Sequence, residues 1–590
     1  LEGKSCELMF MQSNGGLTSA QNFQGKDSIL SGPAGGIVGA VKTSAMAGFS
    51  KIIGFDMGGT STDVSHYNGE YERTLETEVA GVRLRAPMMA IHTVAAGGGS
   101  ILKFDGGRYR VGPNSAGSDP GPACYRNGGE LTVTDANVMV GKLQPDYFPA
   151  IFSPTGDLPL DAEIVSAKFA ALAAATNAFA GDNRTPVEMA AGFLTIAIDK
   201  MATAIKKISS QRGYDVSDYT LCCFGGAGGQ HACLLAEALG MQQILLHPYA
   251  GVLSAYGIGL ADVRVLKERA VELPLVDDTI PILQTIFNEL TAIAQNETLT
   301  QSSTIAAQQI QHQVYLRYIG TDAPLLVDFA PDLVTMRSQF ERIYQQRYSF
   351  IMADRDLIIE LVTVEAIGIM PTPTEPQIAS TRTSRLEPCK TVPVYTKGNW
   401  YQVPIFDRQD LQPGDEIFGP AIVIETTSTN IIEPDWVGTL TAKNYLILTH
   451  DVASSPTARN RIEDVTEKLG QPDPVKLEIF NNLLKSIAEE MGITLQNTSY
   501  SVNIKERLDF SCAIFDRTGQ LIANAPHIPV HLGSMSESVH SLIQAKTLHP
   551  GDVYIANNPY NGGTHLPDIT AITPIFLPTS TTPYFYVASR

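Results

Sequence analysis

The stretch that decides the fold of the first part of this chain is Lys51-Ile-Ile-Gly-Phe-Asp-Met-Gly-Gly-Thr-Ser-Thr-Asp-Val-Ser65. An apolar strand brings Asp56 to its end, and Gly58 and Gly59 then form a tight turn. Glycines allow backbone N–H groups to come close to an anion, and successive N–H groups in a turn form an anion-binding concavity. A carboxylate beside such a turn suits Mg²⁺, because hard cations prefer oxygen ligands. The stretch therefore predicts a phosphate-binding turn with a magnesium site.

The residues after the two glycines supply hydroxyl and carboxylate groups. We expect phosphate contacts from Thr60, Ser61 and Thr62, and positioning of Mg²⁺ or phosphate by Asp56 and Asp63. The pattern is not a Walker A loop, because no Gly-Lys-Ser/Thr follows, and it is not a GxGxxG fingerprint ahead of a helix. The alternative is a glycine-rich β-hairpin with no ligand. Two aspartates and three hydroxyl groups so close together favour phosphate binding.

Three further glycine-rich stretches lie in the same part of the chain. They are Ser31-Gly-Pro-Ala-Gly-Gly36, Ala95-Ala-Gly-Gly-Gly-Ser100 and Cys223-Phe-Gly-Gly-Ala-Gly-Gly-Gln-His231. The last one stands between an apolar strand and a helix, and a glycine-lined helix N-terminus offers unpaired N–H donors. A close backbone crossing in a core explains any one of them equally well. Four such turns in one α/β domain predict a ligand-lined cleft.

The composition excludes several classes of protein. The chain has 590 residues with a formal net charge of −19, which argues against a general nucleic-acid binder. No apolar stretch approaches the roughly 18–20 residues that span a bilayer, so we expect no membrane insertion. The seven cysteines are irregularly spaced with no CxxC pair, which is typical of a reducing compartment and predicts a cytoplasmic protein.

Shifts in pattern along the chain predict five segments. They are an α/β core at 1–275, an α+β region at 276–380, a small β-rich domain at 381–452, a polar linker at 453–474 and a further α+β unit at 475–590. The linker is charged and bounded by prolines, as tethers between folded units are. The chain begins without methionine and ends within a strand pattern, so we expect a fragment truncated at both ends.

The four glycine-rich stretches resemble the hydantoinase A / 5-oxoprolinase family, whose ATPase domain belongs to the actin, Hsp70 and sugar-kinase superfamily. The resemblance covers residues 1 to about 450 and implies ATP and Mg²⁺ as cofactors. It makes the turn from Asp56 to Asp63 the second phosphate loop. The family carries a first phosphate loop upstream, and this chain has only one copy, so the N-terminal part of the ATPase core is expected to be missing. The glycines implied to lie along the adenosine are Gly225, Gly226, Gly228 and Gly229.

Residues 475–590 resemble the start of the hydantoinase B domain. The matching stretches are Arg507–Asp516, Ala525–Ser534 and Asn558–Asp568. His565 and Asp568 stand four residues apart through a turn, which can bring their Cα atoms within about 7 Å, so that both side chains reach one cation. The alternative is a capped, proline-fixed turn. By the resemblance, this pair binds a second divalent metal and forms a second catalytic site, with a further histidine downstream.

Two more histidines of this unit, His527 and His531, are interpreted as residues that line a pocket or serve a structural role. Pro526 and Pro529 forbid an ordinary helix between them. In an extended segment their Cα atoms would lie about 13 Å apart, which disfavours joint ligation of one metal.

Fusion of the two halves in one chain resembles the single-chain members of the family. It implies ATP-driven opening of the small molecule 5-oxoproline to glutamate through phosphorylation of the lactam carbonyl, in a homo-oligomer. One alternative is another ATP-dependent member that acts on N-substituted hydantoins or carboxylates acetone. A different class is an ATP-driven conformational protein of Hsp70 type, and a further alternative is a catalytically inactive fragment.

Overall fold

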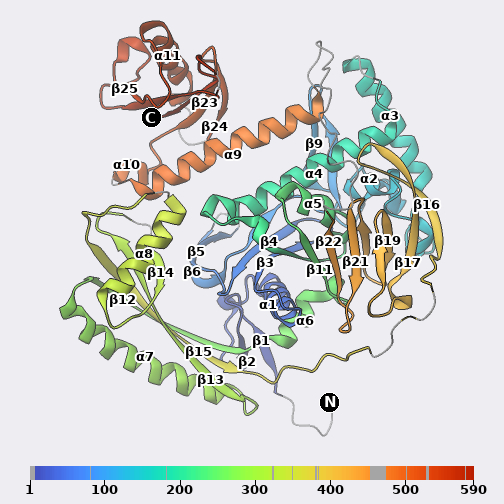
Figure 1. Ribbon diagram of the computed structural model, residues 1–590, viewed down its shortest axis with the longest axis horizontal. Coiled ribbons are helices and arrows are strands. Elements are labelled where there is room, and N and C mark those ends of the chain that lie inside the picture. Colours follow the sequence, from blue (N-terminus) through green and yellow to red (C-terminus); the bar gives the residue numbers. More distant parts are fainter. Residues whose placement is uncertain are drawn as a thin grey trace. The chain divides into compact units, whose positions relative to one another are not determined.

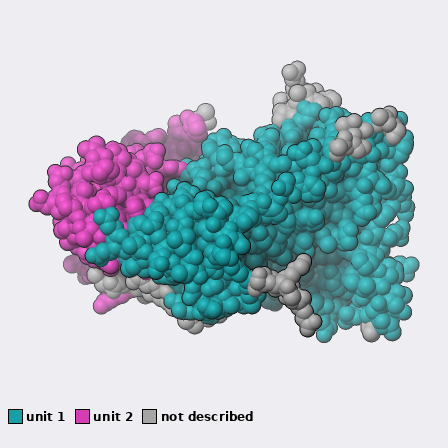
Figure 2. Space-filling view, turned by 90° about the horizontal axis from the view of Figure 1, so that it is seen from below, with its two compact units in different colours: residues 1–267, 288–311, 364–478 teal, residues 268–287, 312–363, 479–590 magenta. Residues whose placement is uncertain are grey.

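The structure is a computed structural model that describes residues 7–79, 82–153, 155–180, 183–321, 324–348, 350–378, 382, 385–451, 473–499, 501–505, 507–525, 530–578 and 580–590. The chain folds into two compact units, which Figure 2 shows in different colours. Unit 1 comprises residues 1–267, 288–311 and 364–478, and unit 2 comprises residues 268–287, 312–363 and 479–590. The predicted linker lies outside the described residues except for its last two positions.

Unit 1 contains a mixed sheet of eight strands in the order β18-β21-β22-β11-β10-β3-β4-β7 (Figure 1). Its first five strands along the chain are β3 (Lys51–Met57), β4 (Thr62–Asn68), β7 (His92–Val94), β10 (Thr220–Phe224) and β11 (Gln243–Leu246). β10 is parallel to β3 and β11, whereas β4 is antiparallel to β3 and β7. All of β10 is buried, as in a strand covered on both faces. This arrangement confirms the predicted α/β, actin-like fold class.

Four helices accompany this sheet: α1 (Ser31–Met46), α4 (Pro186–Ile208), α5 (Ala232–Leu239) and α6 (Leu253–Leu260). α4 starts where Thr185 and Glu188 form a capping box with proline at the first helical position. α5 ends at Gly240, whose φ of 73° gives a left-handed C-cap. Local residues therefore account for where these two helices begin and end.

The first glycine-rich stretch, residues 31–36, is not a turn, and that prediction was wrong. It forms the start of α1, which packs closely against α6. A Cβ on Gly35 would lie 2.7 Å from the Ser254 carbonyl oxygen, and a Cβ on Gly39 would lie 2.7 Å from the Leu253 carbonyl oxygen. The glycines are thus explained by a close helix crossing, because only glycine lets the two backbones approach this far.

The strands of the predicted β-rich domain, residues 381–452, divide between two sheets. β18 (Glu416–Phe418), β21 (Trp436–Leu440) and β22 (Leu446–His450) extend the eight-stranded sheet, while β16 (Lys390–Thr396), β17 (Asn399–Asp407), β19 (Ala421–Ile424) and β20 (Thr429–Ile432) form a sheet of four. β22 pairs antiparallel with β11, which would otherwise be an exposed apolar edge. Residues 364–478 belong to the same compact unit as residues 1–267.

The remaining elements of unit 1 are short strands and two helices. They are β1 (Met9–Met11), β2 (Leu17–Ser19), β5 (Arg73–Val79), β6 (Val82–Met89), β8 (Ser100–Phe104), β9 (Tyr109–Ser115), α2 (Val133–Met139) and α3 (Ala162–Ala180). Five elements contain residues of both units: β12 (Val263–Pro274), α7 (Ile280–Gln301), β13 (Ala307–Tyr318), β15 (Leu357–Ile369) and α9 (Pro474–Thr498).

Unit 2 contains β14 (Leu325–Asp328), α8 (Leu333–Tyr348), α10 (Val502–Lys505) and α11 (Val530–Ala545). Its C-terminal part is an antiparallel sheet in the order β24-β23-β27-β26-β25. These strands are β23 (Cys512–Asp516), β24 (Leu521–Asn524), β25 (Tyr554–Ala556), β26 (Thr570–Ile575) and β27 (Phe585–Ser589). Among the described residues, no helix has the length and apolarity needed to cross a membrane.

Candidate functional site

The predicted turn is the end of a β-hairpin formed by β3 and β4. Asp56 and Asp63 are direct partners in its register, so both side chains lie on the same face of the sheet. The Gly58 amide donates to the Ser61 carbonyl at 3.1 Å and closes the turn. Burial and, to a lesser extent, the neighbouring charge of Asp63 raise the pKa of Asp56 to about 6. The hairpin thus brings two carboxylates together on one face, one of them with a raised pKa.

Two hydroxyl groups from distant segments hold these carboxylates. Thr93 lies opposite Asp63 in the pairing of β4 with β7, and its hydroxyl donates to Asp63 Oδ1 at 2.6 Å. Ser254, near the start of α6, donates to Asp56 Oδ2 at 3.4 Å. Sequence reasoning missed both residues, because a single serine or threonine far from the motif carries no local signal.

Three amides of the turn are free to bind an anion. Within the part of the chain that the structure describes, the N–H groups of Gly59, Thr60 and Ser61 donate no hydrogen bond. Gly59 and Thr60 are exposed, and a Cβ on Gly59 would meet nothing within 4 Å. Successive unpaired amides of this kind form a nest for phosphate oxygens.

Two of the predicted phosphate ligands are engaged inside the protein. The Gly58 amide already closes the turn, and Thr62 is buried with its hydroxyl donating to the Ala96 carbonyl at 2.5 Å. Gly58 and Thr62 therefore stabilise the turn. The amides without a hydrogen bond are those of Gly59, Thr60 and Ser61 between them.

The stretch Ala95–Ser100 packs against the turn and forms backbone hydrogen bonds with it. The Gly98 amide donates to the Gly58 carbonyl at 3.1 Å, and the Gly99 amide donates to the Gly59 carbonyl at 2.6 Å. A Cβ on Gly97 would lie 2.6 Å from the Ser61 nitrogen, so glycine is required for this contact. The stretch packs as a second layer that orients the hairpin turn.

The stretch Cys223–His231 reaches the same site from the end of β10. Gly225 has a φ of 81°, a backbone conformation that favours glycine. A Cβ at this position would also lie only 2.5 Å from Asp56 Oδ1, so a side chain would collide with the carboxylate. Gly226 is exposed. Gly228 and Gly229 are buried, and a Cβ on Gly229 would lie 2.1 Å from the Asn430 amide oxygen. The structure therefore brings Gly225 to Asp56, leaves Gly226 exposed and uses the other two glycines for packing.

The second predicted site, in unit 2, is a closed turn. His565 Nδ1 lies 3.1 Å from Asp568 Oδ2, which also accepts the His565 amide at 3.2 Å and the Thr564 hydroxyl. Burial alone would raise the pKa of Asp568, but the bonds from Thr564 and His565 outweigh it and lower the pKa. The His565 side chain is 69% exposed. The two side chains are in contact, as the four-residue spacing predicts, and their hydrogen bonds are those of the capped turn that was the alternative to a metal site.

The turn brings together one imidazole and one carboxylate, those of His565 and Asp568. In the described ranges, no group of three or more His, Cys, Asp or Glu side chains is arranged to hold a metal ion. His531 is buried and its Nδ1 lies 3.1 Å from the Ser511 hydroxyl, and burial lowers its pKa. His527 lies outside the described residues.

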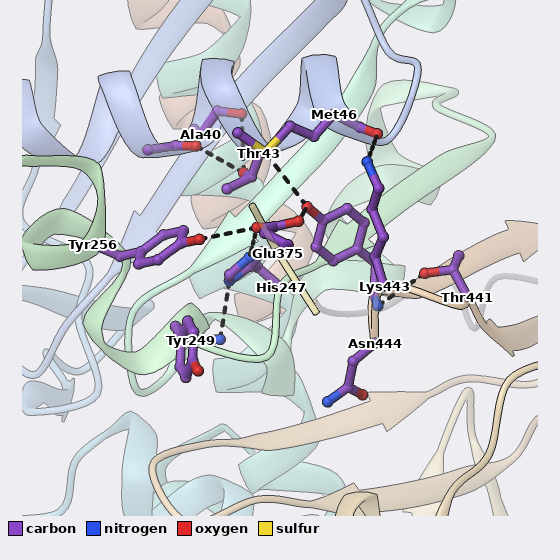
Figure 3. Close-up of polar contacts among 12 residues, drawn as sticks. Ala40, Thr43, Met46, His247, Tyr249, Tyr256, Glu375, Thr441, Lys443 and Asn444 are labelled. Carbon is purple, nitrogen blue, oxygen red and sulfur yellow. Dashed lines mark hydrogen bonds and ion pairs between the residues drawn. The ribbon is translucent and has the colours of Figure 1, made fainter. Parts of the chain in front are cut away.

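Sequence reasoning also missed a cavity of about 620 Å³ in unit 1, lined in part by His247, Tyr249, Tyr256, Glu375 and Lys443 (Figure 3). Glu375 accepts hydrogen bonds from Tyr256 at 3.0 Å, from His247 Nε2 at 3.2 Å and from the hydroxyl of Tyr445. Burial lowers the pKa of His247 to about 4, although Glu375 opposes this shift. The neutral imidazole of His247 thus donates a hydrogen bond to the Glu375 carboxylate. The three hydrogen bonds hold the segment around Glu375 against the cavity wall.

Together, the eight-stranded sheet and the carboxylate-glycine turn define an α/β protein of the actin-like fold class. Three family models match consecutive parts of the chain: Hydantoinase/oxoprolinase at residues 1–267, Hydantoinase/oxoprolinase C-terminal domain at 277–450, and Hydantoinase B/oxoprolinase at 473–590. The chain belongs to the hydantoinase/oxoprolinase family.

Several curated relatives are similar over nearly the whole chain. 5-oxoprolinase 1 of Arabidopsis thaliana is 42% identical over 603 residues, which is 99% of this chain and 46% of the plant protein. 5-oxoprolinase of Saccharomyces cerevisiae is 42% identical over 601 residues, again 99% of this chain and 46% of the relative. This chain thus spans a little under half the length of these relatives.

Two solved structures share the fold. The ATP-dependent caprolactamase from Pseudomonas jessenii matches with a TM-score of 0.68 and 25% identity, over 76% of this chain and 66% of that chain. The nucleotide-free acetone carboxylase matches with a TM-score of 0.58 and 22% identity, over 76% of this chain and 65% of that chain, which supports the fold alone.

Proposed function

We propose that this chain is part of an ATP-dependent cyclic amide hydrolase that converts 5-oxo-L-proline to L-glutamate. Its similarity to proteins named 5-oxoprolinase over 99% of its length supports this substrate. The observation that carries the proposal is the pair Asp56 and Asp63 beside a turn with three free amides. Such a site suits the transfer of a phosphoryl group, which depends mainly on positioning and charge stabilisation.

The lactam has to be activated before it opens, because an unstrained amide is a poor electrophile. In the proposed reaction the lactam carbonyl oxygen attacks the γ-phosphorus of ATP, and the bond to ADP breaks. Water then adds to the activated carbon, the C–N bond breaks and the nitrogen takes a proton. A second water releases phosphate, so that the products are glutamate, ADP and phosphate.

The residues of unit 1 take the following roles in this proposal. The amides of Gly59, Thr60 and Ser61 hold phosphate oxygens, and Gly225 and Gly226 lie along the adenosine. Bound Mg²⁺ would neutralise phosphate charge, and the oxygen-rich pair Asp56 and Asp63 fits that hard cation directly or through water. All of these groups except the adenosine glycines stand on one hairpin, so the β3–β4 register sets their spacing.

For the second half reaction we propose the turn of His565 and Asp568, with a divalent metal as its cofactor. A bound metal would lower the pKa of a water molecule and so supply the nucleophile. The Asp568 carboxylate is kept ionised by its hydrogen bonds, as a metal ligand requires. Asp568→Asn should lower the zinc or manganese bound per chain after metal loading, as measured by mass spectrometry, whereas the exposed Asp354→Asn should not.

We further propose that the enzyme acts in the cytoplasm as a homo-oligomer and binds neither nucleic acid nor membranes. The cysteines in the described ranges are all free thiols: Cys124, Cys222, Cys223, Cys233, Cys389 and Cys512. Free thiols are typical of a reducing compartment.

A second candidate is an enzyme that opens another lactam, and the match to the caprolactamase structure favours it. Release of ADP by the 590-residue protein, measured with 5-oxoproline, caprolactam and hydantoin, separates the two. We expect stimulation by 5-oxoproline above the other two. We also expect Asp56→Asn to abolish that stimulation while Asp354→Asn keeps it. Normal turnover by Asp56→Asn would refute the assignment of the turn, and preference for caprolactam would refute the substrate.

A further inference from the structure

Two glycine-rich stretches of unit 1, residues 95–100 and 223–231, meet at the hairpin turn. The Gly98 amide donates to the Gly58 carbonyl at 3.1 Å, and the Ala227 amide donates to the carbonyl of the residue before Gly58 at 3.0 Å. A Cβ on Gly98 would lie 3.8 Å from the Cβ of Ala227, so the two stretches are also in contact with each other here.

The helix α2 is attached to the first of these stretches. Thr134, in its first turn, donates to the Gly98 carbonyl through its amide at 2.8 Å and through its hydroxyl at 2.9 Å. The start of the helix is set locally, because Thr132 and Asp135 form a capping box. α2 therefore has a fixed position relative to the stretch 95–100.

Asn137 lies three residues further along α2 and contacts the second stretch. It is fully buried, and its Nδ2 donates to the side-chain carbonyl of Gln230 at 2.9 Å. The same Nδ2 lies 3.2 Å from His231 Nε2. Gln230 and His231 are the last two residues of the stretch 223–231, and both are buried. One amide group thus bridges α2, and through it the stretch 95–100, to the stretch 223–231.

The bridge depends on the amide group of Asn137. Its Nδ2 can only donate, so His231 Nε2 accepts and the neutral ring carries its proton on Nδ1. Burial and, to a lesser extent, the charge of Lys142 lower the pKa of His231 to about 3, which keeps the imidazole neutral. A leucine at position 137 has a similar volume, but it would leave both acceptors unpaired.

The bridge is costly for a contact that only stabilises the fold. Among the residues that the structure describes, Asn137 Oδ1 and His231 Nδ1 are buried and have no hydrogen-bond partner. Buried polar atoms without a partner are destabilising, and folded proteins contain few of them. Two such atoms in one bridge between the stretches that border the turn point to a role in binding.

We propose that Asn137 is a positioning residue for the nucleotide, and that its amide sets the spacing between the stretch 223–231 and the hairpin turn. This role rests on the proposed function, in which the turn amides hold phosphate and Gly225 and Gly226 lie along the adenosine. A ligand that contacts both parts needs them at a fixed spacing. A ligand that contacts the turn alone does not.

Calorimetry with two probes separates these two kinds of ligand. Mg²⁺-ADP would contact the turn and the stretch 223–231, whereas Mg²⁺-pyrophosphate would contact the turn alone. Asn137→Leu removes the donor of the bridge, and Gln230→Leu removes an acceptor from its other side. Gln301→Leu is the matched control, because Gln301 is a buried amide that accepts from the Ser19 amide at 3.0 Å and lies outside both stretches.

We expect Asn137→Leu and Gln230→Leu each to weaken binding of Mg²⁺-ADP at least tenfold and to change the affinity for Mg²⁺-pyrophosphate less than twofold. The double variant should lose little more than either single variant, because both substitutions break the same bridge. Gln301→Leu should bind both probes as the unaltered protein does. Thermal melts show which variants fold, and if one single variant does not fold, the other provides the same comparison.

An equal fall in affinity for both probes would overturn the proposal, because the bridge would then act only by stabilising the fold. Unchanged binding of Mg²⁺-ADP by the folded variants would overturn it as well. In both cases the unaltered protein still binds nucleotide, so the proposed function stands. Binding of neither probe by the unaltered protein would instead refute the proposed function, and the positioning role with it.

Discussion

Asp56 and Asp63 lie directly opposite each other across β3 and β4, and a Cβ on Gly225 would lie only 2.5 Å from Asp56. The two carboxylates share one face of a hairpin whose turn has three free amides. Like charges on directly opposed positions are destabilising, and burial adds to this effect. The protein therefore holds a strained charge arrangement at the place where we propose that phosphate and Mg²⁺ bind.

The first prediction concerns pH and stability. The pKa of Asp56 is raised from 3.8 to about 6, so the folded state binds more protons than the unfolded state between these values, and this group's contribution falls as pH rises through that window. At pH 7 the ionised Asp56 destabilises the fold by about 1–3 kcal/mol. Asp56→Asn should therefore raise the free energy of unfolding at pH 7, measured by urea denaturation, and should have no such effect below pH 4. A loss of stability at pH 7 would contradict the raised pKa.

The second prediction concerns the glycine that approaches Asp56. Gly225→Ala should destabilise the protein by about 1–3 kcal/mol, because alanine is strained at a φ of 81° and its Cβ collides with the carboxylate. Gly48→Ala is the matched control, since Gly48 has a φ of 92° and open space around an added Cβ. The difference between their melting temperatures measures the collision alone. Equal losses would show that Gly225 and Asp56 do not approach this closely.

The third prediction concerns the hydroxyl that holds Asp63. Thr93→Val keeps the shape of the side chain and removes a donor at 2.6 Å from Asp63. We expect the affinity for Mg²⁺-ADP to fall about five- to tenfold, which corresponds to roughly 1–1.4 kcal/mol for one hydrogen bond to a charged group. Calorimetry measures the affinity, and the exposed Thr372→Val serves as control. Unchanged Mg²⁺-ADP binding by Thr93→Val would show that the Thr93 hydroxyl does not contribute to nucleotide binding.

The fourth prediction concerns the cavity wall. Glu375→Ala removes the common acceptor of Tyr256, Tyr445 and His247, and should lower stability by about 1–3 kcal/mol because the buried donors of His247 and Tyr445 lose their partner. The exposed Glu387→Ala should change it by less than about 0.5 kcal/mol. The melting temperatures of the two variants, measured by thermal unfolding, test this prediction. Equal melting temperatures would mean that the three hydrogen bonds make no net contribution to stability.

Part of the site was predictable because its geometry is local. Gly58 and Gly59 follow an apolar strand, so a hairpin turn that carries Asp56 and Asp63 could be read from the residues alone. The same holds for His565 and Asp568, which a four-residue turn brings together. Thr93 and Ser254 were not predictable, because they reach the two carboxylates from β7 and α6 and have no motif of their own.

The glycines show the limit of reading residues without contacts. The sequence does not say whether a glycine faces a ligand or another backbone. Gly35 allows α1 to meet α6, and Gly229 packs against Asn430, although both stand in stretches that were predicted as ligand-lined turns. Gly225, in the same short stretch as Gly229, does approach Asp56.

By itself, the sequence determined the β-hairpin that carries Asp56 and Asp63, because a hairpin depends on residues within one short segment and on backbone hydrogen bonds between its ends. The actin-like class followed from the resemblance of the glycine-rich motifs to a known family. Only the tertiary structure decided the raised pKa of Asp56 and the joining of β22 to β11. Burial and edge pairing arise between segments hundreds of residues apart, and no local pattern encodes them.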